Sequence, residues 1–147
     1  MFGSPNATEE QIEEALVISQ AKEFVDTKEG RLDAIVEQGG KNLSGGQRQR
    51  LTLARALVPQ SDILIMDDSA SALDYATDAK LRKAIQNMKR KPTVFIVSQR
   101  TSSIQDADSI LVLDDGKIAG KGTHEELIAS CDIYREIYET QFKKEEA

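Results

Sequence analysis

Ile63-Leu64-Ile65-Met66-Asp67-Asp68 is the stretch that decides the fold class of this chain. Four consecutive apolar residues before two carboxylates are typical of a parallel-sheet strand that is covered on both faces and ends at a ligand-binding edge. Residues 93–97 and 109–113 are similar apolar runs. Helical patterns are interspersed with these runs, which indicates an α/β fold. We expect Met66 and Phe95 to lie in its core.

Helix-start signals divide the chain. A Ser or Thr followed three residues later by Gln or Glu forms a capping box, in which each side chain accepts a hydrogen bond from the other residue's backbone N–H. The pattern occurs at Thr8, Ser44 and Thr123. We predict a helical subdomain over residues 1–55, which ends with the helix that Ser44 begins, and an α/β portion with terminal helices over residues 56–147.

The composition excludes several classes of protein. Of the 147 residues, 39% are hydrophobic and 30% charged, which argues against a disordered or fibrous chain. The net charge of −6 argues against nucleic acid as the main partner. No apolar run reaches the length of about 18 residues that a membrane span requires. The single cysteine, Cys131, cannot form an internal disulfide, which is consistent with a reducing cytosol.

Residues 42–50 contain a candidate anion site. Ser44, Gly45 and Gly46 stand at a helix start, where backbone N–H groups and the helix dipole favour a phosphate and glycine permits its close approach. A well-capped helix with a flexible entry would explain the same three residues. Gln47 and the arginines of the next turns favour the phosphate interpretation.

The carboxylates after the strand form a second candidate site. Asp67, at the carboxyl end of a parallel strand, could hold Mg²⁺ through a water molecule, and Asp68 could orient or deprotonate a water. Asp74 could simply cap the next helix. Because two aspartates after a strand also form an ordinary turn, these residues alone leave both interpretations open.

Together these motifs resemble those of the ATP-binding cassette (ABC) ATPases. Residues 43–47 (LSGGQ) resemble the signature motif, residues 63–67 the Walker B strand, and residues 71–74 the D-loop. Residues 97–100 lie where the family has its switch loop, and residues 122–127 resemble a stretch typical of exporter-type members. The resemblance implies a partial P-loop NTPase-like core, a parallel sheet with flanking helices, plus a small helical subdomain.

The resemblance also implies ligands and partners. ATP would lie between the P-loop of one domain and the signature motif of a second domain, paired head to tail. The implied nucleotide contacts are Ser44, Gly45, Gly46, Gln47 and Asp74. Asp67 would hold Mg²⁺. The domain pair would serve transmembrane domains at the cytoplasmic side of the cell membrane, with no nucleic-acid partner.

The chain departs from the family pattern at its catalytic positions. The family has a glutamate that positions the attacking water where this chain has Asp68, and a displacement of about 1 Å can cost about 10²-fold in rate. Gln99 replaces the switch histidine and cannot carry its charge. No Gly-Lys pair in the sequence belongs to a G-x-x-x-x-G-K-[ST] motif, so the P-loop strand is missing. We expect the only histidine, His124, at the surface.

These departures favour the C-terminal part of the degenerate-site subunit of a heterodimeric exporter. By itself the chain would not hydrolyse ATP, and its incomplete sheet would leave an open edge and an uncovered apolar face. One alternative is a non-catalytic regulatory or interaction module that uses the same fold. A DNA-repair or chromosome-maintenance ATPase is less favoured, because the chain is acidic and has no coiled-coil heptads.

Overall fold

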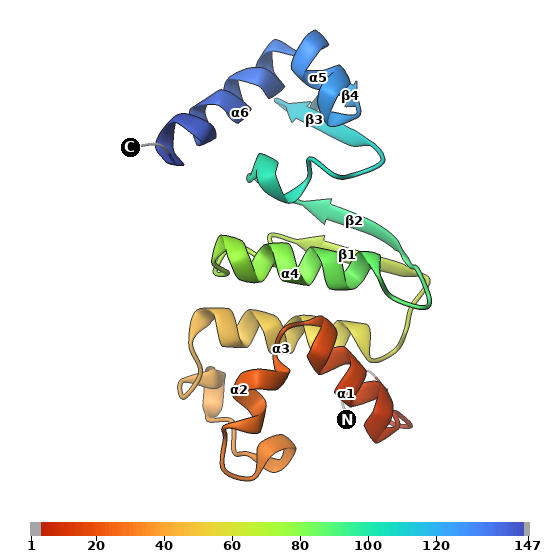
Figure 1. The fold of residues 1–147 in the computed structure, drawn as a ribbon, viewed down its shortest axis with the longest axis vertical. Helices are drawn as coiled ribbons and strands as arrows, with labels where there is room; N and C mark the ends of the chain where they lie inside the picture. Colours follow the sequence, from red (N-terminus) through yellow and green to blue (C-terminus); the bar gives the residue numbers. More distant parts are fainter. Residues whose placement is uncertain (1–3, 146–147) are drawn as a thin grey trace. The chain divides into compact units, whose positions relative to one another are not determined.

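The structure, a computed structural model, describes residues 4–145. The chain groups into two compact units, Met1–Val97 and Ser98–Ala147, and each is described by itself. The first unit contains α1 (Glu9–Ile18), α2 (Lys22–Asp26), η1 (Arg31–Asp33), η2 (Gln38–Gly40), α3 (Gly45–Leu57), β1 (Ile63–Asp67), α4 (Tyr75–Gln86) and β2 (Thr93–Val97) (Figure 1). The second contains η3 (Thr101–Ser103), β3 (Ile110–Asp114), β4 (Lys117–Gly122), α5 (His124–Ser130) and α6 (Asp132–Glu145). The α/β class is confirmed. The boundary between a helical subdomain over residues 1–55 and an α/β portion over residues 56–147 stays a prediction.

The three predicted capping boxes are all present. The hydroxyls of Thr8, Ser44 and Thr123 each accept from the backbone N–H three residues on, and the side chains there accept in return. Each box satisfies two backbone N–H groups that a helix start would otherwise leave without partners. These local signals fix where α1, α3 and α5 begin.

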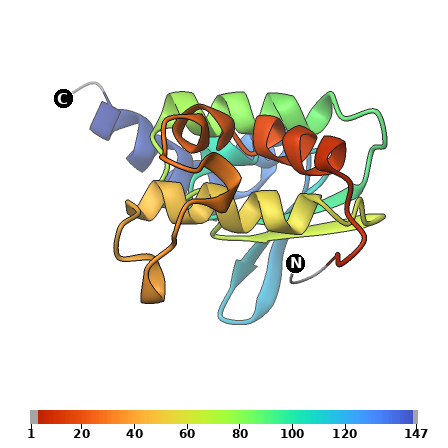
Figure 2. The ribbon, with the colours of Figure 1, turned by 90° about the horizontal axis from the view of Figure 1, so that it is seen from below.

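The core of the first unit lies between its helices and one face of its sheet. Helix α1 packs on both α3 and α4, which run alongside each other (Figures 1 and 2). The most deeply buried apolar residues of this core are Ala15, Leu16, Ala21, Leu53, Met66 and Leu81. Met66 is 3% exposed, as predicted for a core residue.

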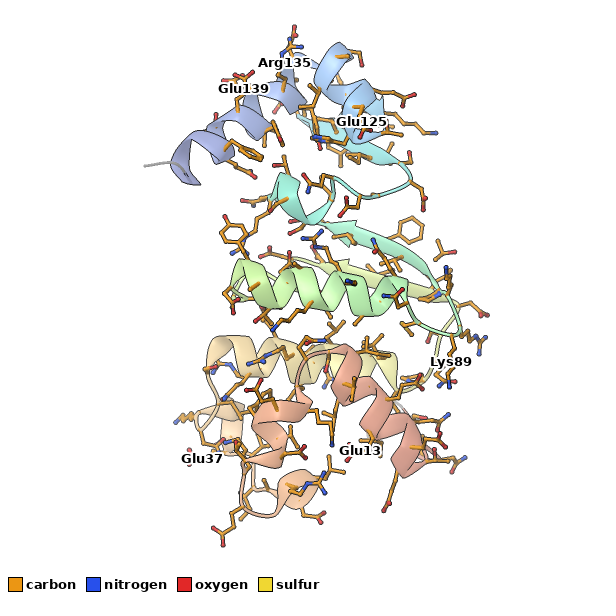
Figure 3. All side chains as sticks on the ribbon, in the orientation of Figure 1. Glu13, Glu37, Lys89, Glu125, Arg135 and Glu139 are labelled. Atoms are coloured by element: carbon orange, nitrogen blue, oxygen red, sulfur yellow. The ribbon has the colours of Figure 1, made fainter. Side chains whose placement is uncertain are left out.

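An ion-pair cluster holds the N-terminal helices of this unit together. The Glu13 carboxylate, labelled in Figure 3, lies 2.5 Å from Lys22 Nζ and 3.2 Å from Arg31 Nη2. Asp26 pairs with the same two cations, at 3.2 and 2.7 Å. Because these side chains are more than a third exposed, the cluster orients α1, α2 and η1 more than it stabilises the unit.

Strands β1 and β2 form a two-stranded parallel sheet that is covered on one face only. Leu64 and Met66 are buried in the core, with Val94 and Ile96 packed against them. The alternate side chains are more than half exposed: Ile63, Ile65, Phe95 and Val97. The prediction of strands covered on both faces is therefore wrong for the described residues, and Phe95 is not a core residue. The expected uncovered apolar face is confirmed.

The second unit is built on an antiparallel hairpin of β3 and β4. Asp115 and Gly116, both at positive φ, form its turn. Its core consists of Ile110, Val112, Leu127, Cys131 and Tyr134. Among residues 4–145, no helix has the length and apolar character of a bilayer-spanning segment.

The expectation of a surface position for His124 is wrong. Its Nδ1 lies 2.9 Å from the Tyr134 hydroxyl oxygen, and its ring centroid lies 5.0 Å from that of Tyr138. Tyr134 is buried, and burial raises the pKa of its hydroxyl. His124, the first residue of α5, therefore packs against α6 as a half-buried residue.

Candidate functional site

The start of α3 presents an exposed serine with a defined hydrogen-bond state. Ser44 has an extended backbone, and its Oγ accepts from the Gln47 N–H at 3.2 Å. Gln47 Oε1 accepts from the Ser44 N–H at 3.0 Å. Because the Ser44 hydroxyl acts as an acceptor in this box, its own hydrogen can be donated to a ligand.

The next two backbone amides belong to Gly45 and Gly46. The first N–H groups of a helix have no acceptor within the helix, and the capping box uses only the amides of Ser44 and Gln47. Gly45 and Gly46 are partly exposed and lie at the positive end of the α3 dipole. A capped helix start and an anion site are therefore compatible in the same four residues.

Gly46 is required by packing as well. A Cβ atom at this position would lie 3.0 Å from the Ala72 carbonyl oxygen, tighter than an ordinary contact. A Cβ at Gly45 would meet only the Ala72 Cβ, at 3.6 Å. The first turn of α3 thus lies against the loop that joins β1 to α4. That loop would crowd a side chain at position 46 but not a Cβ atom at position 45.

Gln49 ties the same helix to this loop through both ends of its amide. Its Nε2 donates to Ser71 Oγ at 2.9 Å, and its Oε1 accepts from the Ala72 N–H at 3.0 Å. The sequence analysis did not single out Gln49. The contacts join residues 22 and 23 positions apart, and no local pattern signals them.

Arg50 fixes the other side of the first turn of α3. Its Nη1 donates to the Gln20 carbonyl at 2.8 Å, and its guanidinium lies over the Phe24 ring, 4.9 Å from the centroid. These contacts attach α3 to the segment that joins α1 and α2. The Ser44 turn is therefore held by rigid neighbours on two sides, which limits the entropy that ordering it around a ligand would cost.

Asp67 and Asp68 lie at the carboxyl end of β1, with both side chains exposed. Asp68 has a left-handed backbone (φ 47°), a conformation that aspartate tolerates better than most residues. Its N–H donates to the Val97 carbonyl at 3.0 Å, and its carbonyl accepts from the Ser71 N–H and hydroxyl at 3.2 and 3.0 Å. The backbone is thus fixed at both ends of the residue, while the carboxylate faces solvent.

The carboxylates fit a magnesium ion only as part of a larger site. Within the described residues, no group of three or more His, Cys, Asp or Glu side chains is placed to hold a metal. Mg²⁺ in phosphate sites keeps several waters and takes only one or two carboxylates, the remaining ligands being phosphate oxygens. Asp67 therefore fits as one contributor to a magnesium–nucleotide site.

Asp74 is the N-cap of α4. Its Oδ1 accepts from the Thr77 N–H at 2.9 Å, and its Oδ2 accepts from the Thr77 hydroxyl at 2.8 Å. The Thr77 backbone N–H, followed by the hydroxyl, holds the pKa of the Asp74 carboxyl below its usual range. The capping interpretation of Asp74 is therefore correct, and a nucleotide contact would have to coexist with it.

The structure brings most of the predicted site residues together in the first unit. The turn at residues 44–47 and the loop over residues 67–74 lie against each other through Gly46 and Gln49. Gln99 belongs to the second unit, where its side chain is exposed and its carbonyl accepts from Gln141 Nε2 at 2.6 Å.

Comparisons with known proteins show the family. A sequence model described as ABC transporter matches residues 4–71. The chain is 42% identical to the ATP-dependent lipid A-core flippase of Shewanella frigidimarina over 137 residues, which are 93% of this chain and 23% of that protein. It belongs to the ABC transporter family.

Other relatives agree with this assignment. An uncharacterised ABC transporter ATP-binding protein of Mycobacterium tuberculosis (strain H37Rv) is 45% identical over 141 residues, 95% of this chain and 24% of that protein. The solved structure of a bacterial Atm1-family ABC exporter with ATP bound is similar to 95% of this ABC chain, with a TM-score of 0.90 and 31% identity. The chain thus corresponds to part of the ATP-binding domain of exporter-type members, and it spans about a quarter of the length of the proteins it matches.

Proposed function

We propose that Ser44, Gly45 and Gly46 bind the γ-phosphate of an ATP molecule that is held mainly by the P-loop of a second nucleotide-binding domain. The observation that carries this proposal is the exposed turn at the start of α3. It offers one hydroxyl hydrogen and two backbone amides to an anion, at the positive end of a 13-residue helix. Family membership supplies ATP as the ligand.

The remaining candidate residues act around this nucleotide site in the proposal. Asp67 helps to hold a Mg²⁺ ion, which when bound neutralises phosphate charge. Asp68 and Gln99 occupy the two catalytic positions in place of the family's glutamate and histidine, which weakens catalysis at this site. Gln47 and Asp74 lie beside the nucleotide and keep the starts of α3 and α4 in place through their caps.

The proposed assembly is a head-to-tail pair with a second nucleotide-binding domain, which differs from this chain and supplies the P-loop. Such a pair would drive transmembrane domains from the cytoplasmic side of the cell membrane and power transport. The charge of −6 argues against a nucleic-acid ligand.

The test uses the full chain and a P-loop-bearing nucleotide-binding domain that binds but does not hydrolyse ATP. We expect Mg-ATP, and not Mg-ADP, to increase their association, measured by analytical ultracentrifugation. Gly45→Asp should reduce the ATP-dependent association at least tenfold, because a carboxylate at the helix start repels phosphate while it favours the helix dipole.

Gly45→Asn is the matched control, since it has nearly the same size and no charge. It should retain clearly more of the association than Gly45→Asp, and the Cβ atom that both variants add meets the Ala72 Cβ at an ordinary 3.6 Å. Equal losses in the Asp and Asn variants would contradict phosphate binding at this turn. Association that is independent of nucleotide would instead favour the regulatory or interaction module.

A further inference from the structure

One side chain on the C-terminal helix binds the segment that contains Gln99. Gln141 of α6 accepts at Oε1 from the Thr101 N–H, at 2.9 Å, and from the Thr101 hydroxyl, at 3.0 Å. Its Nε2 donates to the Gln99 carbonyl at 2.6 Å. The Gln141 side-chain amide therefore hydrogen-bonds three polar groups of residues 99–101: the Gln99 carbonyl, the Thr101 N–H and the Thr101 hydroxyl.

Only one orientation of this amide fits its surroundings. The Thr101 N–H can only donate, so it requires the side-chain oxygen, and the Gln99 carbonyl can only accept, so it requires the nitrogen. Glutamate would keep the acceptor but face the Gln99 carbonyl with a second oxygen. Asparagine is one methylene shorter, and methionine offers no comparable hydrogen bond.

The segment is fixed by other contacts as well. Thr101 is 4% exposed and begins η3, and Ser98 Oγ accepts from the Arg100 N–H at 3.0 Å. The Gln99 side chain is exposed between these two anchors. The side chain starts from a backbone that Gln141 holds at the Gln99 carbonyl.

We propose that Gln141 is a positioning residue for Gln99: its amide sets the backbone of residues 99–101 and so the place from which the Gln99 side chain meets a ligand. The ligand part of this statement rests on the function proposed above. The positioning part does not, because the hydrogen bonds exist in the chain without any nucleotide.

The test compares hydrogen exchange and carbonyl chemical shifts by NMR in the full chain. In Gln141→Met, which keeps the length of the side chain, the Thr101 amide should exchange roughly fivefold faster or more, and the Gln99 carbonyl ¹³C shift should change. In Gln141→Glu, the Thr101 amide should stay within about twofold of the wild type at neutral pH, while the Gln99 shift changes.

Acid pH supplies a rescue that tests the hydrogen bond to the Gln99 carbonyl itself. When the introduced carboxyl of Gln141→Glu is protonated, its O–H can donate to the Gln99 carbonyl, so the Gln99 shift should return toward the wild-type value. Thr140→Ala is the matched control, because among the described residues the Thr140 hydroxyl bonds to the Glu136 carbonyl of its own helix. It should leave both the exchange rate and the shift unchanged.

The outcomes separate the two proposals. Unchanged Thr101 exchange in Gln141→Met, or a Gln99 shift in Gln141→Glu that ignores pH, would overturn the positioning role. If Gln141→Met does not fold by circular dichroism, the Gln141→Glu arm decides alone. If the NMR results are as expected but ATP does not promote association with a P-loop domain, the nucleotide function fails while the positioning role stands.

Discussion

Gly46 and Ala72 lie so close together that a methyl group on residue 46 would come within 3.0 Å of the Ala72 carbonyl oxygen. This contact makes the turn that starts α3 and the loop that follows β1 parts of one packed structure. The candidate phosphate-binding turn and the candidate catalytic carboxylates therefore cannot move independently by much.

The first prediction concerns this contact. Gly46→Ala should lower the free energy of unfolding by about 1–3 kcal/mol, the usual cost of overpacking against backbone. Gly45→Ala should stay within about 0.5 kcal/mol, because the new methyl meets Ala72 at an ordinary 3.6 Å. Urea denaturation of both variants measures the difference, and equal costs would contradict the close approach at Gly46.

The second prediction concerns Gln49. Gln49→Leu removes the hydrogen bonds of the Gln49 amide to Asp68, Ser71 and Ala72 of the loop and should lower the free energy of unfolding by about 1–2 kcal/mol. The Ala72 amide should exchange faster with solvent. Thr52→Ala on the same helix is the control, because the partner of the Thr52 hydroxyl within residues 4–145 is the Arg48 carbonyl, one turn back. A Gln49→Leu variant with unchanged Ala72 exchange would show that the loop is held by other contacts.

The sequence predicts the parts of this structure that depend on neighbours in the chain. The capping boxes at Ser44 and Thr123 are examples, since each needs only four consecutive residues. Other contacts join residues 19 to 42 positions apart, namely those of Gln49 to the loop and those of Gln141 to residues 99–101. No pattern of neighbouring residues predicts such contacts. Phe95 was placed in the core for a related reason: an all-apolar strand does not reveal which of its faces the helices will cover.

A third prediction follows from the lowered pKa of Asp74. Because the Thr77 N–H and hydroxyl lower the pKa in the folded state, the cap adds stability above the unfolded pKa of about 3.9, and that contribution is lost as pH falls through the folded pKa. Thermal melts between pH 7 and pH 3 should show a larger loss for the wild type than for Asp74→Asn. Asparagine also caps but does not titrate, so parallel pH profiles would exclude the effect.

The fourth prediction uses the two faces of the β1–β2 sheet. Met66→Ala should cost about 2–5 kcal/mol of unfolding free energy, because Met66 is buried against the helices. Ile65→Thr, on the exposed face, should change stability by less than about 1 kcal/mol and should reduce aggregation. Light scattering measures the second effect. Undiminished aggregation in Ile65→Thr would mean that this face is not the source of self-association.

The fifth prediction concerns the weakened catalytic positions and rests on the proposed function. In a transporter that contains this chain, Asp68→Glu together with Gln99→His should raise ATP turnover at the site these residues line. The expected gain is on the order of 10²-fold if the shortened carboxylate is the main defect. Phosphate release measured site by site checks it, and unchanged turnover would count against the degenerate-site interpretation.

The sheet of β1 and β2, which is covered on one face only, has a consequence for the register of its strands. Residues 63–66 of β1 are apolar on both faces, so a slip of one residue against β2 would exchange one apolar set of these side chains for another. In the observed alignment, Thr93 N–H donates to the Asp62 carbonyl at 2.8 Å, and Asp68 N–H donates to the Val97 carbonyl at 3.0 Å. The same slip would turn Asp67, which belongs to the exposed set, toward the helices, and burial of an unpaired carboxylate is costly. Asp67 at the candidate site therefore disfavours that misalignment.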